Sequence, residues 1–143
     1  MTSLRISTDP AELDVPVIHR FLSEQSYWAK GISRTVVEKA IAGSLCFGAY
    51  TEAGQVAFAR VVTDSATFAY LKDVFVLPEH RGHGYGVAIM QAVMGHPALQ
   101  TVQILLGTAD AHGLYTRFGF VTQLYPERRM VRPGSFLPKA QRE

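Results

Sequence analysis

Apolar and polar residues alternate with two different periods along the chain, and the period changes near Ser44. Before this point apolar residues recur every three or four positions, which is typical of helices with one buried face. This spacing predicts a helix over Pro10–Ser23. It predicts a second helix that begins after an N-cap at Ser33 and continues to Ala42.

After this change the pattern favours strands, with two further helices between them. Strands are predicted at Leu4–Ser7, Leu45–Thr51, Gln55–Thr63, Phe68–Leu77, Val102–Leu106, Phe120–Thr122 and Arg129–Val131. Helices are predicted at Val87–Met94 and, capped by Asp110, at Ala111–Phe118. The order of these elements lacks unbroken strand–helix alternation, which argues against a doubly wound parallel fold. It predicts an α/β (α+β) protein with one mixed sheet and helices on both faces.

Composition narrows the class of protein. The 143 residues include 48% hydrophobic and 18% charged residues, which is enough apolar material for one folded domain. The net charge of +2 is too balanced for a general nucleic-acid binder. The single cysteine, Cys46, and the absence of Cys/His clusters indicate neither a disulfide nor a metal site. We expect a single cytoplasmic domain with no nucleic-acid or membrane partner, and a loose tail from Pro133 onward.

Three glycines lie between a predicted strand and a predicted helix, in the segment Arg81-Gly82-His83-Gly84-Tyr85-Gly86. Glycine tolerates positive φ and lets a ligand approach the backbone. The amides of such a turn, together with the free N–H groups of the next helix, can bind an anion, and Arg81 can add a planar charged group. The spacing fits neither the dinucleotide fingerprint nor the nucleotide P-loop. A pyrophosphate is the ligand that this turn suits best.

Two motifs make the chain resemble the GNAT N-acetyltransferase superfamily. The glycine turn resembles its coenzyme A motif, R-x-x-G-x-G, after the strand that ends in Val74-Phe-Val-Leu-Pro78. The second segment, Ala111-x-x-x-Tyr115-x-x-x-Gly119-Phe120, resembles the later signature of the same family. The resemblance implies a GNAT fold with a central, mostly antiparallel sheet. It also implies acetyl transfer from acetyl-CoA to a primary amine, without a metal.

The resemblance also assigns expected roles to residues. Tyr115 is expected to protonate the departing thiolate and to contact the cofactor. The remaining residues expected to bind acetyl-CoA are Val74, Phe75, Val76, Arg81, Gly82, His83, Gly84, Tyr85 and Gly86. The family often has an asparagine before the last helix, where this chain has Thr108-Ala-Asp110, and His83 replaces the more usual Lys, Arg or Gln.

The general base is left open by the sequence. Asp73 is a candidate because aspartate is rare inside strands, although it could equally pair with Lys72 or a neighbouring strand. Glu24, His80 and a chain of water molecules are the alternatives.

The acceptor is expected near the first two helices, beside Glu24, Tyr27 and Trp28, where aromatic faces and a carboxylate could hold a cationic amine. Its identity does not follow from the sequence, nor does the oligomeric state, for which a homodimer is one option. The alternative function is a non-catalytic CoA-binding sensor or interaction module with the same fold.

Overall fold

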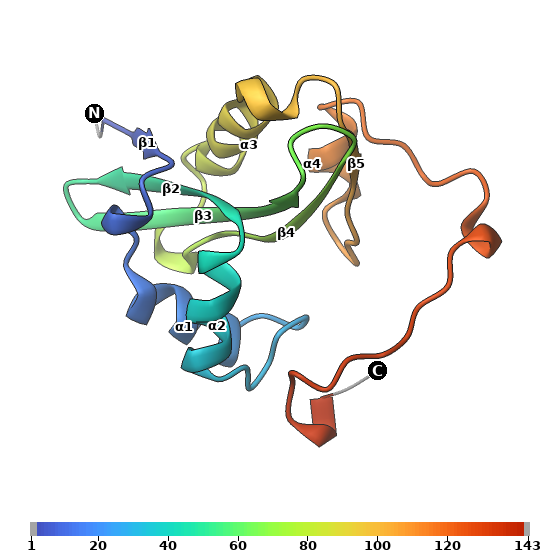
Figure 1. Cartoon of the computed structure of the whole chain (residues 1–143). Coiled ribbons are helices and arrows are strands. Elements are labelled where there is room, and N and C mark those ends of the chain that lie inside the picture. The colour runs from blue at the N-terminus through green and yellow to red at the C-terminus, as the bar shows by residue number, and fades with distance from the viewer. Residues whose placement is uncertain (1–2, 142–143) are drawn as a thin grey trace.

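The computed structural model describes residues 3–141, and its centre is one five-stranded sheet in the order β1-β2-β3-β4-β5 (Figure 1). The strands are β1 (Arg5–Ser7), β2 (Leu45–Thr51), β3 (Gly54–Thr63), β4 (Phe68–Val76) and β5 (Gln103–Leu105). The first four are antiparallel neighbours, and β4 pairs with β5 in parallel. The predicted mixed, mostly antiparallel sheet is confirmed.

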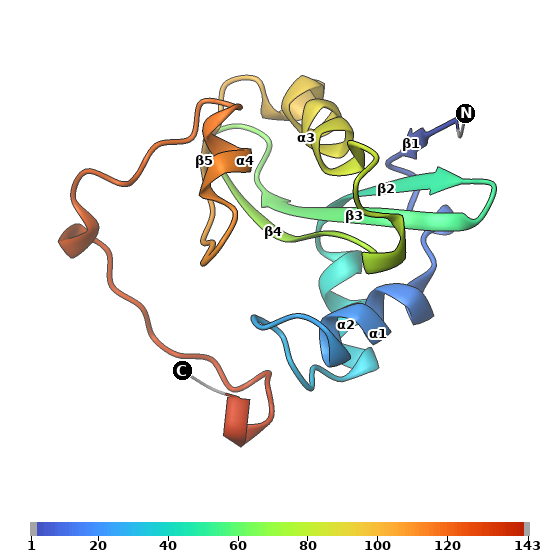
Figure 2. The ribbon, with the colours of Figure 1, turned by 180° about the vertical axis from the view of Figure 1, so that it is seen from behind.

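Helices cover both faces of this sheet, as predicted (Figure 2). The helices are α1 (Val15–Glu24), α2 (Arg34–Ala42), α3 (Tyr85–Gly95) and α4 (His112–Thr116). One core, here the α3-face core, contains side chains of α3 and α4 against β2, β3 and β4. The other, the α1-face core, contains side chains of α1 and α2 with Phe58 and Phe75. In the part of the chain that is described, no helix has the length and apolar character needed to span a membrane.

The first helix begins later than predicted. Pro10–Glu12 form a separate 3₁₀ turn, and α1 begins at Val15, after Asp14. The Asp14 carboxylate accepts a hydrogen bond from the Val17 N–H at 3.2 Å. Pro16 has no N–H and would obstruct the interior of a helix that started at Pro10, so it is accommodated in the first turn of α1.

The other differences lie toward the C-terminus. Helix α3 begins two residues earlier than predicted, at Tyr85. Ala111, and not Asp110, is at the N-cap of α4, and its N–H donates to Thr108 Oγ1 at 3.0 Å. The predicted strands at Phe120–Thr122 and Arg129–Val131 are wrong, because within residues 3–141 the chain forms no strand after β5. This part of the chain leaves the sheet and runs as an extended arm (Figure 1).

Candidate active site

Strand β4 has an open edge beside the last helix. Its parallel pairing with β5 joins only Phe68–Tyr70 to Gln103–Leu105, and among the described residues nothing pairs with Leu71–Val76 on that side. The two strands therefore separate as β4 continues toward the glycine turn, and the unpaired edge at Leu71–Val76 is hereafter called the opening. An extended ligand that carries amides can add to such an edge in the manner of another strand.

A β-bulge interrupts this open stretch. Phe58 pairs with Phe75 and Arg60 with Lys72, so that the two residues Asp73 and Val74 lie opposite one residue of β3. Asp73 has a φ of +55°, which aspartate tolerates better than most residues. Bulges often redirect side chains beside functional sites. Here the bulge leaves Val74 in the α3-face core and turns Asp73 toward α1.

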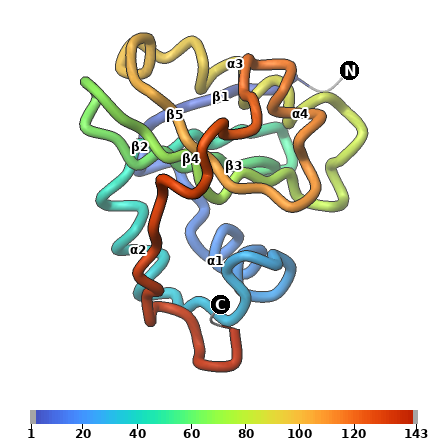
Figure 3. Tube along the Cα trace, turned by 90° about the vertical axis from the view of Figure 1, so that its right-hand side faces the viewer, coloured from blue at the N-terminus to red at the C-terminus, as the bar shows by residue number. Residues whose placement is uncertain are grey.

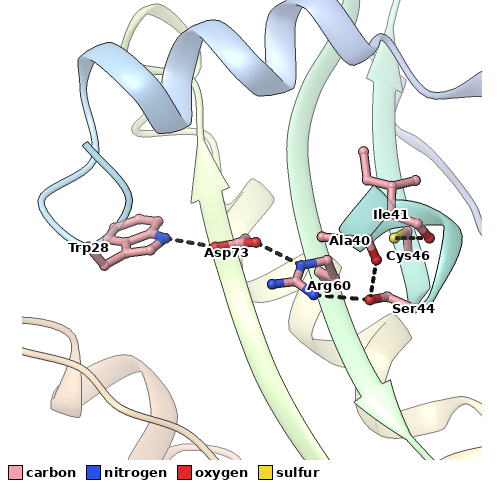
Figure 4. A network of polar contacts seen from close by, with 7 residues as sticks. All are labelled: Trp28, Ala40, Ile41, Ser44, Cys46, Arg60 and Asp73. Atoms are coloured by element: carbon pink, nitrogen blue, oxygen red, sulfur yellow. Dashed lines mark hydrogen bonds and ion pairs between the residues drawn. The ribbon is translucent and has the colours of Figure 1, made fainter. Parts of the chain in front are cut away.

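The Asp73 carboxylate is held from both sides (Figure 4). Trp28 Nε1 donates to its Oδ1 at 2.8 Å, and Arg60 Nε donates to its Oδ2 at 2.8 Å. Only 9% of the Asp73 side chain and 12% of the Arg60 side chain are exposed. Arg60 Nη1 also donates to Ser44 Oγ at 3.0 Å, and this hydroxyl donates to the Ala40 carbonyl. Asp73 thus pairs with the neighbouring strand β3, which was the alternative to its acting as a base.

Aromatic side chains form a wall on the α1 side of the bulge. Phe21 stacks on Phe75 with ring centroids 4.0 Å apart, and Trp28 lies against Phe21 at 6.2 Å. The Tyr27 ring meets Trp28 edge-on at 5.1 Å and is largely exposed. The two aromatic residues predicted to bind the acceptor therefore lie together, and Trp28 also contacts Asp73.

Tyr115 lies on the α3 side of the sheet, whereas the aromatic wall lies on the α1 side. It is buried in the α3-face core, where its ring meets Phe120 edge-on at 5.9 Å. Burial, and to a smaller extent Tyr27 and Asp110, raise the pKa of Tyr115 to about 12. Ala109 N–H donates to Tyr27 Oη at 2.8 Å, which ties the loop before α4 to the loop after α1. Because its pKa is raised, the Tyr115 phenol keeps its proton at neutral pH.

Glu24 is the predicted acceptor residue that the structure does not bring into contact with this group. It is exposed at the end of α1. Within residues 3–141 it makes no hydrogen bond or ion pair with Tyr27, Trp28 or Asp73.

The glycine turn begins shortly after the open edge of β4 ends. Gly82 and Gly84 have φ values of +87° and +79°, and a Cβ at either would meet no atom within 4 Å. Gly84 is the N-cap of α3 and supplies no side chain to its first amides. These free amides favour an anion, as does the N-terminal end of the helix dipole. Arg81 Nε donates to the Val76 carbonyl at 3.1 Å, which places its exposed side chain between the edge and the turn.

Four other residues predicted to bind the cofactor lie in this region, and two of them, Tyr85 and Phe75, have buried side chains. Tyr85 belongs to the α3-face core and Phe75 to the α1-face core, so each can meet a ligand at the open edge or turn chiefly through its backbone. A Cβ at Gly86 would lie 3.7 Å from Val76 Cγ2, which shows how closely α3 packs on β4. His83 is exposed, with its ring 5.5 Å from that of Tyr85.

Sequence reasoning missed Arg60 and Ser44 as members of the site. The signal for Arg60 was present: it is the one charged residue in the apolar strand Gln55–Thr63. A buried charge of this kind needs a partner of opposite sign. The signal for Ser44 was absent, because a serine after a helix has many ordinary uses.

Comparison with known proteins agrees with this geometry. Residues 42–122 match the acetyltransferase (GNAT) domain. A crystal structure of a GNAT-family protein from Xanthomonas campestris is 55% identical, with a TM-score of 0.89, and the match covers 92% of this chain and 94% of that one. This chain belongs to the GNAT acetyltransferase family.

Two more distant relatives extend the comparison. This GNAT chain is 35% identical over 133 residues to an acetyltransferase-type protein of the fungus Gibberella zeae, a match covering 77% of this chain and 74% of the relative. A Mycobacterium tuberculosis protein solved in complex with CoA is 21% identical. Its TM-score is 0.62, over 83% of this chain and 71% of that one, and this likeness shows that the two chains share a fold.

Proposed function

We propose that this GNAT protein transfers the acetyl group of acetyl-CoA to a primary amine of a small molecule or peptide. The observation that carries the proposal is the continuity between the open edge of β4 and the glycine turn, with the protonated Tyr115 near the opening. The Mycobacterium tuberculosis neighbour, which was solved with CoA, supports the choice of ligand.

The residues present fit acetyl-CoA at this place. The absence of Cβ atoms at Gly82 and Gly84 leaves room for a pyrophosphate beside the amides that begin α3. Arg81 adds a permanent positive charge. The pantetheine amides would pair with the backbone at Val74 and Val76. When bound, acetyl-CoA supplies the acyl group already activated as a thioester.

The reaction forms one C–N bond and breaks one C–S bond. A free N–H of Val74 or Val76 would stabilise the negative charge that develops on the carbonyl oxygen, and donors of this kind contribute several kcal/mol. Tyr115 would give its phenolic proton to the departing sulfur, and the raised pKa ensures that the proton is available.

The acceptor amine would enter beside Tyr27 and Trp28, with Glu24 attracting it from the exposed end of α1. Both oxygens of Asp73 already accept hydrogen bonds, so we assign Asp73 to positioning Trp28 and the bulge. The amine would then lose its proton to solvent, directly or through a chain of water molecules.

The proposal is tested by incubating the protein with acetyl-CoA and a panel of primary amines. We expect CoA thiol release that depends on one class of amine, with an acetylated product 42 Da heavier by mass spectrometry, ~42 Da being the mass of the added C₂H₂O. Acetyl-CoA should also stabilise the fold by about 2.7 kcal/mol at a hundredfold excess over Kd. Absence of any thermal shift at saturating acetyl-CoA would refute the proposal. A shift without thiol release across the panel would favour the sensor function.

Gly84→Val is expected to weaken CoA binding at least tenfold, because its side chain would occupy the space above the amides of the turn. The measurement is calorimetric titration with CoA. The matched control is Gly54→Val in the β2–β3 hairpin, where φ is also positive and a Cβ also meets no atom within 4 Å. Both variants place a β-branched residue at a positive φ, so equal CoA affinities would show that the glycine turn is not part of the site.

A further inference from the structure

The loop before α4 approaches the loop after α1, although the two are far apart in the sequence (Figure 3). The hydrogen bond from Ala109 N–H to Tyr27 Oη joins them across 82 positions of the chain. Thr108 Oγ1 holds the other end of the same loop, because it accepts a hydrogen bond from the Ala111 N–H at 3.0 Å. These two bonds fix the backbone on either side of Asp110.

The Asp110 carboxylate has no structural partner in this arrangement. The side chain is exposed, and among residues 3–141 it accepts no hydrogen bond and forms no ion pair. The cap of α4, which the sequence predicts for it, is Ala111 instead. Its charge nevertheless acts on Tyr115, since Asp110 is one of the groups that raise the pKa of that phenol. A free carboxylate therefore lies close to the group assigned to protonating the thiolate.

Tyr27 presents an aromatic ring in the same place. The residue is 56% exposed, yet its ring is held at the hydroxyl by Ala109 and at the edge by Trp28. These contacts restrict the side chain without burying it, and a fixed, exposed aromatic face is suited to a cation. Tyr27 also contributes to the raised pKa of Tyr115, as Asp110 does. The exposed ring, the free carboxylate and the phenol therefore lie together.

We propose that Asp110 and Tyr27 bind a second positive charge on the acceptor, one that is separate from the amine to be acetylated. This inference rests on the proposed function. The reacting amine must lose its proton, whereas a nearby carboxylate favours the protonated form of an amine. The charge bound by Asp110 is thus that of a different group, and the acceptor class is a diamine or another amine with a further cationic group.

Selection for such an acceptor depends on local charge. The net charge of the chain is +2, so its overall field does not attract a cation. Asp110 supplies the attraction at the loop before α4, and the exposed Glu24 adds a second negative charge at the end of α1. The Tyr27 ring, between a fixed hydroxyl and Trp28, adds a cation–π contact.

The test uses three amines that share one methylene chain and differ only at its far end. Putrescine ends there in an ammonium, pentylamine in a methyl group and δ-aminovalerate in a carboxylate. We expect kcat/KM, measured by thiol release at saturating acetyl-CoA, to be about tenfold higher for putrescine than for pentylamine, the effect of one hydrogen bond to a charged group. It should be lowest for δ-aminovalerate. Added salt should reduce the preference, because exposed charges are screened.

Variants of Asp110 assign the preference to this carboxylate. Asp110→Asn keeps the shape of the side chain and removes its charge, so the ratio of kcat/KM for putrescine and pentylamine should fall close to one. Asp110→Lys should reverse the order of putrescine and δ-aminovalerate. The matched control is Glu52→Gln, which removes one charge in the exposed β2–β3 turn and should keep the wild-type ratio. A merely structural defect would slow all three amines alike and leave the ratio unchanged.

The outcomes separate this inference from the proposed function. If a larger amine is the better substrate, the same three compounds are compared as competitors of that amine. Thiol release without preference for putrescine would overturn the second cation site while supporting acetyl transfer. A preference that survives Asp110→Asn would overturn the role of Asp110. Absence of both thiol release and a thermal shift with acetyl-CoA would refute the proposed function, and this inference with it.

Discussion

Tyr115→Phe is expected to lower kcat by ~10²–10⁴-fold, the usual contribution of a positioned general acid or base. The substitution keeps the ring that packs against Phe120 and removes only the O–H. Binding of acetyl-CoA should change much less, because the lost interaction stabilises chiefly the transition state. The measurements are steady-state kinetics with the amine identified by the panel and calorimetry with acetyl-CoA.

Tyr50→Phe is the matched control for this prediction. Tyr50 is also a buried tyrosine, and its hydroxyl has no hydrogen-bond partner among the described residues, but it lies on β2, which β3 separates from β4. Its phenylalanine variant should retain full kcat. In the wild type, a phenol with a pKa of about 12 stays protonated between pH 7 and 10, so this group should cause no loss of rate there. A Tyr115→Phe protein with wild-type kcat would show that another group protonates the sulfur.

The parts of the site that lie within short segments were predictable from sequence. The glycine turn and the spacing of Ala111, Tyr115 and Gly119 depend on neighbouring residues, and local rules of helix and turn formation apply to them. The order of strands β2, β3 and β4 followed from hairpin signals at Glu52-Ala-Gly54 and Asp64-Ser-Ala66.

Features that depend on distant contacts were not predictable in the same way. The bulge at Asp73 shifts the register of β4 by one residue, and nothing in the alternation of β4 alone requires this. The Arg60 partner of Asp73 comes from another strand, and Trp28 comes from 45 positions earlier in the chain. The C-terminal strands failed for a related reason: a strand at Arg129–Val131 would need to pair with a distant strand, and the local alternation does not show whether that pairing forms.

Arg60→Met is expected to destabilise the fold by about 3–5 kcal/mol, the cost of leaving one member of a buried ion pair without its partner. Arg60 and Asp73 are nearly buried, and without Arg60 the carboxylate would keep only the Trp28 N–H. Unfolding by urea, monitored through Trp28, the single tryptophan, measures the change. A loss below about 1 kcal/mol would mean that the pair behaves as a surface ion pair.

The second substitution, Asp73→Asn, separates the two roles considered for Asp73. Asparagine keeps an oxygen for the Trp28 N–H and tolerates positive φ, but it cannot accept a proton from the amine. In the double variant Arg60→Met/Asp73→Asn no unpaired charge is buried, so we expect it to recover much of the stability lost in Arg60→Met.

The folded double variant also tests whether Asp73 acts as the general base. If Asp73 positions Trp28 and the bulge, kcat should fall far less than the ~10²–10⁴-fold expected for loss of a general base. The loss should also be the same at every pH, because no titrating base has been removed. If Asp73 is the base, kcat should instead fall by the full ~10²–10⁴-fold. Kinetics from pH 5 to 10 on the wild type and the double variant distinguish these outcomes, and the second would return Asp73 to the catalytic residues.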